Sequence, residues 1–194
     1  MKKVKNVLLS GVGGQGIILA SKVLSVGLIE AGFDVKMSEV HGMAQRGGSV
    51  TTQVRFGEKV YSPIIGLGQA DILVGFEKME AGKWLEFLNP AGKIVINDFK
   101  IPSAPILTGD VQYPEGIIKE IKSKIKDVTV VDGPDLAKKV GNVKTMNIAI
   151  MGSLIKALEL DKVINWEEVI AKVVKEKFVD VNIKAFNLGM AQVK

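Results

Sequence analysis

The chain has 194 residues, 47% of them hydrophobic, and a formal net charge of +5 from 26 basic and 21 acidic residues. This length suits one domain with a sizeable core and is short for two, so we expect a single domain over 1–194. With no cysteine and one histidine, the sequence excludes disulfides, a cysteine nucleophile and thiolate-held clusters, and it predicts no metal site.

The first segments predict a strand, a buried helix and a second strand. The run "VKNVLLSG" (4–11) is short, apolar and ends in glycine, as expected of a first strand. Residues 15–31 are apolar on most faces, which predicts a buried helix that ends at Gly32. The segment "DVKMSEV" (34–40) follows as a second strand. Together the three have the size of a βαβ unit.

The next segments predict a hairpin, a buried strand and a helix. The stretch "SVTTQVRFGEKVYS" (49–62) alternates and turns near Gly57, which is a hairpin signal. The run "ADILVGF" (70–76) is continuously apolar, as buried parallel strands are. Residues 77–89 are expected to form a helix that Pro90 stops.

The second half begins with a strand over 92–98, followed by a proline-containing segment over 99–114 that we expect to be mostly loop. Isoleucines recur every four residues in 117–125, which predicts an amphipathic helix. The segment 127–133 is the last strong strand, and the pattern beyond it is helical.

Three helices are predicted in the C-terminal third. Residues 145–159 are nearly all apolar, Asn165 and Glu168 resemble a capping box, and Phe186 lies on the apolar face of a terminal helix. The predicted fold is therefore one α/β domain with a mostly parallel, Rossmann-like sheet flanked by helices, a hairpin near 50–62 and a helical C-terminal third.

A glycine motif joins the first strand to the first helix. Its residues, "GVGGQG", satisfy G-x-G-x-x-G. Such a turn presents the free N–H groups and the positive dipole end of a helix to an anion. We therefore predict a cofactor-binding loop made of Gly11, Gly13, Gly14, Gln15 and Gly16. In a dinucleotide site the ribose-binding acid would be Glu39, at the end of the second strand. Alternatively, the glycines only allow the strand and helix to pack closely.

A second motif, "SEVHGMAQRGGSV" (38–50), contains the only histidine of the chain and one of its two arginines. Arg46 suits a bidentate grip on phosphate or carboxylate, and His41 titrates near neutrality. We predict that Arg46, Gly47 and Gly48 contribute to cofactor binding. Alternatively, the histidine is structural and the arginine pairs with an acid at a subunit contact. The candidates for a catalytic role are Glu39, His41, Gln45 and Arg46.

The two motifs together resemble a known family. The segments "GVGGQGIILASKVL" and "SEVHGMAQRGGSVTTQVRFG" are similar to the gamma subunits and domains of 2-oxoacid:ferredoxin oxidoreductases, within them the small subunits of the indolepyruvate enzymes. The resemblance continues through "ADILVGFEKMEA" and reaches the terminal "VDVNIKAFNLGMA", so that it covers essentially the whole chain.

The resemblance implies a CoA-acylating oxidative decarboxylation of aryl pyruvates such as indolepyruvate. It also implies thiamine diphosphate, Mg and [4Fe–4S] clusters that pass electrons to ferredoxin, with coenzyme A as co-substrate. The chain lacks cysteine, and its Gly109-Asp110 is followed by valine instead of completing a thiamine-binding G-D-G. We therefore expect these cofactors on a large partner subunit and no activity from this chain alone. Its two motifs would face the partner's active site, the first offering N–H groups to the coenzyme A diphosphate.

Two other functions remain open from the residues alone. One is a self-contained Rossmann-type NAD(P)-dependent dehydrogenase, and the other is a nucleotide-responsive, non-enzymatic binding module. The lysines are spread along the chain, which is typical of a solvated surface, so we expect no nucleic-acid partner. No apolar run approaches the roughly 18 residues that span a bilayer, so we expect no membrane partner and a cytoplasmic protein.

Overall fold

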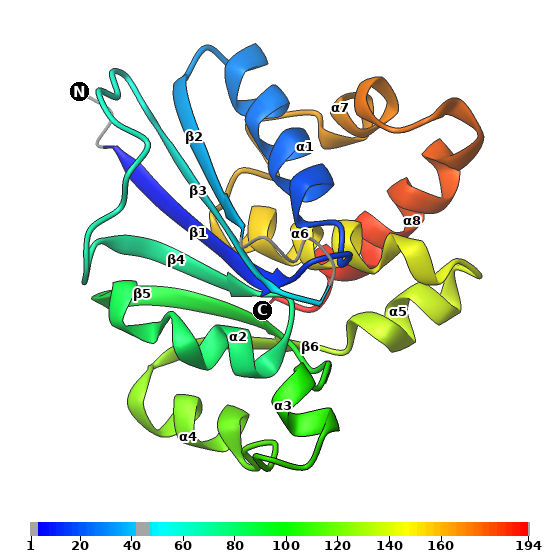
Figure 1. The fold of residues 1–194 in the computed structure, drawn as a ribbon. Coiled ribbons are helices and arrows are strands. Elements are labelled where there is room, and N and C mark those ends of the chain that lie inside the picture. Colours follow the sequence, from blue (N-terminus) through cyan, green and yellow to red (C-terminus); the bar gives the residue numbers. More distant parts are fainter. Residues whose placement is uncertain (1–3, 42–46, 194) are drawn as a thin grey trace.

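The computed structural model describes residues 4–41 and 47–193, which form one six-stranded sheet with helices on both faces (Figure 1). The strands are β1 (Lys5–Val12), β2 (Asp34–His41), β3 (Ser49–Gly57), β4 (Ala70–Gly75), β5 (Leu88–Asn97) and β6 (Asp127–Val131). The helices are α1 (Ile17–Glu30), α2 (Lys78–Lys83), α3 (Ala104–Leu107), α4 (Ile117–Lys124), α5 (Gly133–Lys139), α6 (Met146–Ala157), α7 (Trp166–Val173) and α8 (Val179–Met190).

The sheet has the strand order β2-β3-β1-β4-β5-β6. The strands β1, β4, β5 and β6 are parallel to one another, whereas β3 runs antiparallel to both β1 and β2. The central strands read as continuous apolar runs because helices cover both of their faces. The predicted mostly parallel α/β sheet is confirmed.

Two apolar cores lie on opposite faces of the sheet. The larger core joins side chains of α1, α6, α7 and α8 to one face, with Leu24, Ile150 and Phe186 fully buried in it. The smaller core joins α2 and α4 to the other face of β4 and β5. The helices that follow β1 and β4 in sequence therefore cover opposite faces, which matters for the position of the site.

The prediction of a hairpin near 50–62 is wrong, because only its first strand forms and this strand pairs with other parts of the chain. Residues 49–57 form the single strand β3, and the chain beyond Gly57 crosses to β4 without forming another strand. The antiparallel partner of β3 is β2, with His41 opposite Val50. As a consequence β3 separates β1 from β2, so the strands of the predicted βαβ unit are parallel but not adjacent.

The helix predicted over 77–89 is shorter than expected. It ends at Lys83, a 3-10 turn follows, and β5 already begins at Leu88. Pro90 thus lies inside β5, where the register with β4 shifts between Ala70 and Ile72. A proline has no N–H to donate to a neighbouring strand, so it fits where the regular pairing is interrupted.

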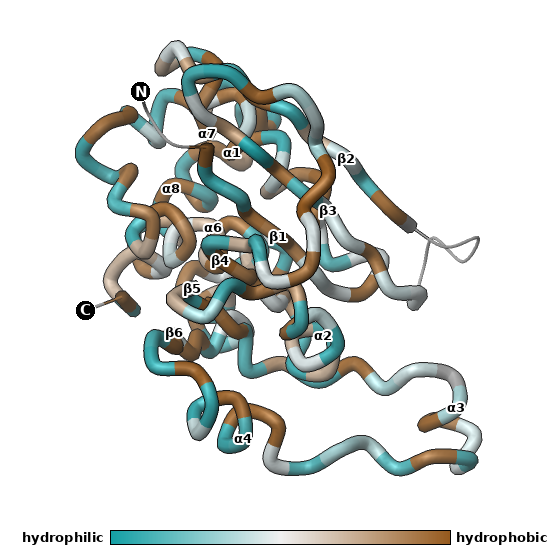
Figure 2. The backbone as a smooth tube through the Cα atoms, turned by 90° about the vertical axis from the view of Figure 1, so that its left-hand side faces the viewer, coloured by the Kyte–Doolittle hydropathy of each residue, from teal (hydrophilic) through white to brown (hydrophobic). Residues whose placement is uncertain are grey.

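The predicted loop over 99–114 is mostly irregular and contains the short helix α3, which stands out from the body of the molecule (Figure 2). The helical C-terminal third is confirmed. At the start of α7 the capping box differs in detail. The Asn165 amide donates to the Glu168 carboxylate at 2.7 Å, and its side chain accepts no backbone N–H. No helix among the described residues has the length and hydropathy to cross a membrane.

Candidate functional site

The candidate site lies where β1 and β4 end side by side. From this edge α1 leads the chain to one face of the sheet and α2 leads it to the other (Figure 1). In open α/β sheets such a change of direction leaves a crevice beyond the carboxyl ends of the strands, where ligands bind. The glycine motif begins in the last two residues of β1, Gly11 and Val12, and continues beyond the strand, so it lies at this crevice.

Glycine is required at the positions of the first motif for different physical reasons. A side chain at Gly11 would place its Cβ 2.7 Å from Gln15 Oε1 and 2.9 Å from Phe76 Cβ. At Gly16 the Cβ would lie 2.5 Å from Asn147 Nδ2, and the backbone there is left-handed with φ +78°. Close packing thus accounts for these two. Gly14 also needs its positive φ of +103°, but its Cβ position faces open space.

Gln15 uses its side chain to hold the loop together. Its Oε1 accepts from Val12 N at 2.7 Å, and its Nε2 donates to Phe76 O at 2.7 Å. The side chain is buried, with 9% of the residue exposed. The same Phe76 carbonyl accepts from Asn97 Nδ2 at 3.0 Å, so the ends of β4 and β5 share one acceptor with the glycine motif.

The start of α1 has free donors beside a hollow. Gly16 is the N-cap and supplies no side-chain cap, and within the described residues no acceptor meets the N–H groups of Gly14, Gly16, Ile17 and Ile18. These groups border a hollow of about 340 Å³. It is lined by Val12, Gly13, Gly14, Gly16, Ile17, Ile18 and Val50. Apolar walls next to unpaired N–H donors suit an anionic group carried on a larger organic molecule.

The structure brings the described end of the second motif onto the first. Gly13 N donates to Gly48 O at 2.8 Å, and Gly47 N donates to Gly13 O at 3.3 Å. The two glycine segments are therefore joined by a pair of backbone hydrogen bonds. His41 is the last residue of β2, while Gln45 and Arg46 lie outside the described residues.

Glu39 is not adjacent to the glycine motif. It lies on β2 opposite Thr52 of β3, and Thr52 lies opposite Leu9 of β1. Two strand spacings, about 10 Å, therefore separate Glu39 from β1. In a dinucleotide site the acid ends the strand next to β1, so this sheet order does not favour the ribose role that we considered for Glu39.

Several polar residues at this edge were missed by the sequence reasoning. Asn147 lies in the apolar helix α6 with 4% of the residue exposed, and its Nδ2 donates to Gly16 O at 3.0 Å. Asn97 at the end of β5 also accepts from Gly133 N at 3.0 Å. Glu77 and Glu80 follow β4 and are buried. Two features of the sequence could have pointed to them: Glu77 comes directly after a buried strand, and Asn147 is a lone amide in an apolar helix.

The described residues contain no cluster of three or more histidine, cysteine, aspartate or glutamate side chains arranged to hold a metal ion. Asp110, the acid of the incomplete G-D-G segment, accepts a hydrogen bond from Thr108 Oγ1 at 2.6 Å in an exposed part of the chain. The donor set of this chain, which has no cysteine at all, does not fit a cysteine-ligated cluster.

Comparison with known proteins assigns the chain to a family. The family model described as pyruvate ferredoxin/flavodoxin oxidoreductase matches residues 6–192. The chain belongs to this family. It is 37% identical to the indolepyruvate oxidoreductase subunit IorB of Pyrococcus horikoshii, an alignment that covers 99% of this chain and 97% of that protein.

Two solved structures share the fold of this oxidoreductase family member. Pyruvate oxidoreductase subunit PORC of Thermotoga maritima has a TM-score of 0.72 at 21% identity, over 100% of this chain and 98% of that one. The 2-oxoglutarate:ferredoxin oxidoreductase of Magnetococcus marinus has a TM-score of 0.70 at 18% identity. That match covers 99% of this chain and 31% of the larger one, so the same fold occurs as one part of a longer polypeptide.

Proposed function

We propose that the chain is the small subunit of a heteromeric 2-oxoacid:ferredoxin oxidoreductase that acts on an aryl pyruvate such as indolepyruvate. The observation that carries this proposal is the 37% identity to an indolepyruvate oxidoreductase subunit over nearly the full length of both chains. The family match over residues 6–192 supports the same reaction class. The enzyme would decarboxylate the 2-oxo acid oxidatively and transfer the acyl group to coenzyme A, with ferredoxin as electron acceptor.

The redox and carbanion chemistry belongs on a large partner subunit. This chain has no cysteine for [4Fe–4S] clusters, and its Gly109-Asp110-Val111 segment does not complete a thiamine-binding motif. Thiamine diphosphate, Mg and the clusters would therefore be held by the partner. The isolated chain is expected to be inactive and to show no cluster absorbance.

The part assigned to this chain is to bind and orient an anionic group at the edge where β1 and β4 end. The free N–H groups of Gly14, Gly16, Ile17 and Ile18 border the apolar hollow, and they suit the diphosphate of coenzyme A. In agreement with such a role, the Magnetococcus marinus enzyme that shares this fold was solved with coenzyme A bound. Arg46, next to Gly47, would add a bidentate contact to the same anion or to the partner.

The exposed side chain of Ile18 allows a test that spares the fold. Ile18 lines the hollow and is 55% exposed, so Ile18→Glu places a negative charge beside the proposed diphosphate without disturbing the core. Repulsion between charges about 6 Å apart at an intermediate dielectric predicts a KM for coenzyme A about tenfold higher. The neutral control, Ile18→Gln, is expected to change it much less.

The assay uses this chain assembled with its large subunit. It measures indolepyruvate- and coenzyme A-dependent reduction of ferredoxin, with the KM for each substrate determined separately. An unchanged KM for coenzyme A in Ile18→Glu would contradict the binding role of the glycine loop. Turnover of indolepyruvate by the isolated chain would contradict the assignment as an accessory subunit.

A further inference from the structure

Two buried carboxylates lie beside the candidate site and have no role in the function proposed so far. Glu77 is 0% exposed and Glu80 is 2% exposed, and both follow β4 at the edge where the glycine motif lies. Burying a carboxylate is unfavourable unless hydrogen bonds or charges compensate it. The partners of these two side chains therefore indicate what they hold in place.

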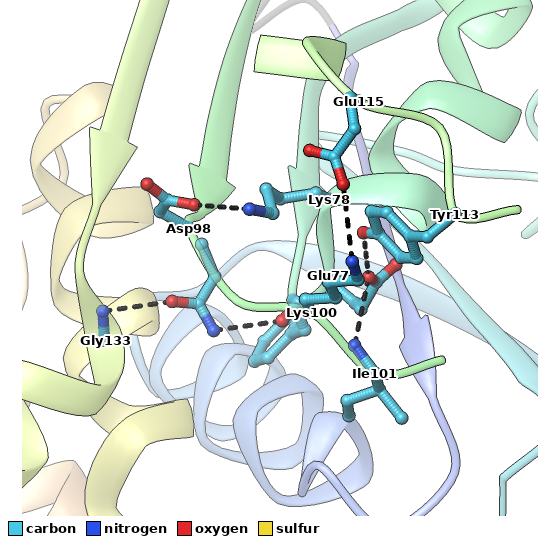
Figure 3. Close-up of polar contacts among 10 residues, drawn as sticks. Glu77, Lys78, Asp98, Lys100, Ile101, Tyr113, Glu115 and Gly133 are labelled. Carbon is cyan, nitrogen blue, oxygen red and sulfur yellow. Dashed lines mark hydrogen bonds and ion pairs between the residues drawn. The ribbon is translucent and has the colours of Figure 1, made fainter. Parts of the chain in front are cut away.

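Glu77 joins α2 to the segment that carries α3 (Figure 3). Its Oε2 accepts from Glu80 N at 2.9 Å, which caps α2, and its Oε1 accepts from Ile101 N at 3.2 Å and from the Tyr113 hydroxyl. Burial and then the adjacent Glu77 raise the pKa of the Tyr113 phenol, so the phenol keeps its proton and remains a donor at neutral pH. Glu77 thus fixes the start of α2, from which Glu80 extends.

Glu80 joins α2 to the second motif. Its Oε2 accepts from Ser49 Oγ at 2.6 Å, and its Oε1 accepts from Lys83 Nζ at 2.7 Å. Ser49 begins β3 and directly follows Gly48, whose carbonyl accepts from Gly13 N at 2.8 Å. A short path of two hydrogen bonds therefore leads from a buried carboxylate to the glycine motif.

We propose that Glu80 is a positioning residue that acts through Ser49 to hold Gly48 against Gly13, and that it thereby sets the width of the anion-binding hollow. The role in binding rests on the proposed function, whereas the structural role does not. Ser49 is an exposed residue at the end of a strand, a place where chains fray. A short, charge-assisted hydrogen bond to a buried acceptor opposes this fraying.

The test removes the Ser49 hydroxyl and leaves Glu80 in place. In the assembled enzyme, Ser49→Ala is expected to raise the KM for coenzyme A about tenfold, the usual effect of losing a hydrogen bond to a charged group. The KM for indolepyruvate and the kcat at saturating coenzyme A should change little. Ser49→Thr keeps a hydroxyl and should restore the KM.

The matched control is Lys83→Met. It removes the other partner of Glu80, an ion pair whose lysine side chain is 48% exposed, and does not touch Ser49. The KM for coenzyme A should stay at its original value. If Lys83→Met raises this KM as much as Ser49→Ala does, the path through Ser49 is wrong.

Hydrogen exchange separates the positioning role from the coenzyme A assignment. The Gly13 amide, which donates to Gly48 O, should exchange faster in the assembled Ser49→Ala enzyme than in the original. Faster exchange with an unchanged KM for coenzyme A would support the positioning role and overturn the coenzyme A site. Unchanged exchange together with an unchanged KM, in an enzyme whose KM still responds to Ile18→Glu, would overturn the positioning role alone.

Discussion

The contact between α6 and α8 gives a sharp prediction about stability. These helices approach so closely that a Cβ at Gly189 would lie 1.8 Å from Ala149 O, and a Cβ at Gly152 would lie 2.1 Å from Phe186 O. Both obstacles are backbone atoms, which no rotamer change can move. We therefore predict that Gly189→Ala forces the two helices apart.

The magnitude follows from the distance. An ordinary contact of 3.4 Å requires the Ala149 carbonyl and the new Cβ to separate by about 1.6 Å. Ala185 and Phe186 of α8 are buried against the large core and would lose contacts in such a shift. The expected loss is about 3 kcal/mol in the free energy of unfolding, the upper end of the usual range for overpacking. For a chain of this length it corresponds to a melting temperature lower by about 6–12 °C.

The measurement is thermal and urea unfolding of the purified protein, followed by circular dichroism. Gly82→Ala is the matched control, because Gly82 lies inside α2 and its Cβ would lie 3.7 Å from Ile117 Cγ2 of α4, an ordinary contact. This control should raise stability by up to about 1 kcal/mol through helix propensity. A Gly189→Ala protein within about 1 kcal/mol of the original would refute the backbone contact that we describe.

Two further substitutions test local features away from the site. Glu159 follows α6 in a left-handed conformation with φ +59° and is exposed, so Glu159→Gly should raise the free energy of unfolding by about 1 kcal/mol, whereas Glu159→Ala should not; equal melting temperatures for the two variants would argue against strain at this residue. The hydrogen bond from Lys36, and then the one from Val60 N, lower the pKa of Asp34 below its usual 3.8. A carboxyl whose pKa is lower in the folded state stabilises the protein above the unfolded-state pKa, and this contribution is lost as the pH falls through the folded-state pKa. Asp34→Asn should therefore lower stability at neutral pH and make the difference from the original protein shrink below about pH 4; a difference that does not depend on pH would contradict this role.

The hydropathy pattern was sufficient to predict most helices and strands. It was insufficient to predict which strands lie next to each other in the sheet. The strands near 4–11 and 70–76 were predicted because a buried strand is a short apolar run between turn residues. The hairpin near 50–62 was misassigned since alternation marks a strand but does not identify the neighbouring strand. The chain after Gly57 could form a new strand against β3 only if one edge of β3 were free. Both edges are already occupied, one by β2 and the other by β1.

At the candidate site, too, the local motif could be predicted from the sequence but its long-range contacts could not. The glycine motif and its place between a strand and a helix were readable because glycine is required wherever a backbone turns tightly or must be approached closely. The pairing of Gly13 with Gly47 and Gly48 was not readable, since more than thirty residues of chain separate them and only the antiparallel insertion of β3 beside β1 brings them together.

The sequence by itself determined most element types, the glycine turn between the first strand and the first helix, and the absence of cysteine ligands for a cluster, because these depend on residue chemistry and on short spacings. Only the tertiary structure decided which side chains support that turn. Ser49, Glu80 and Asn147 come from three different elements and meet at one edge of the sheet. These residues lie at the same edge because of the strand order and because α2 and α6 pack on opposite faces of the sheet. Such long-range contacts cannot be predicted from the hydropathy periodicity of a single sequence.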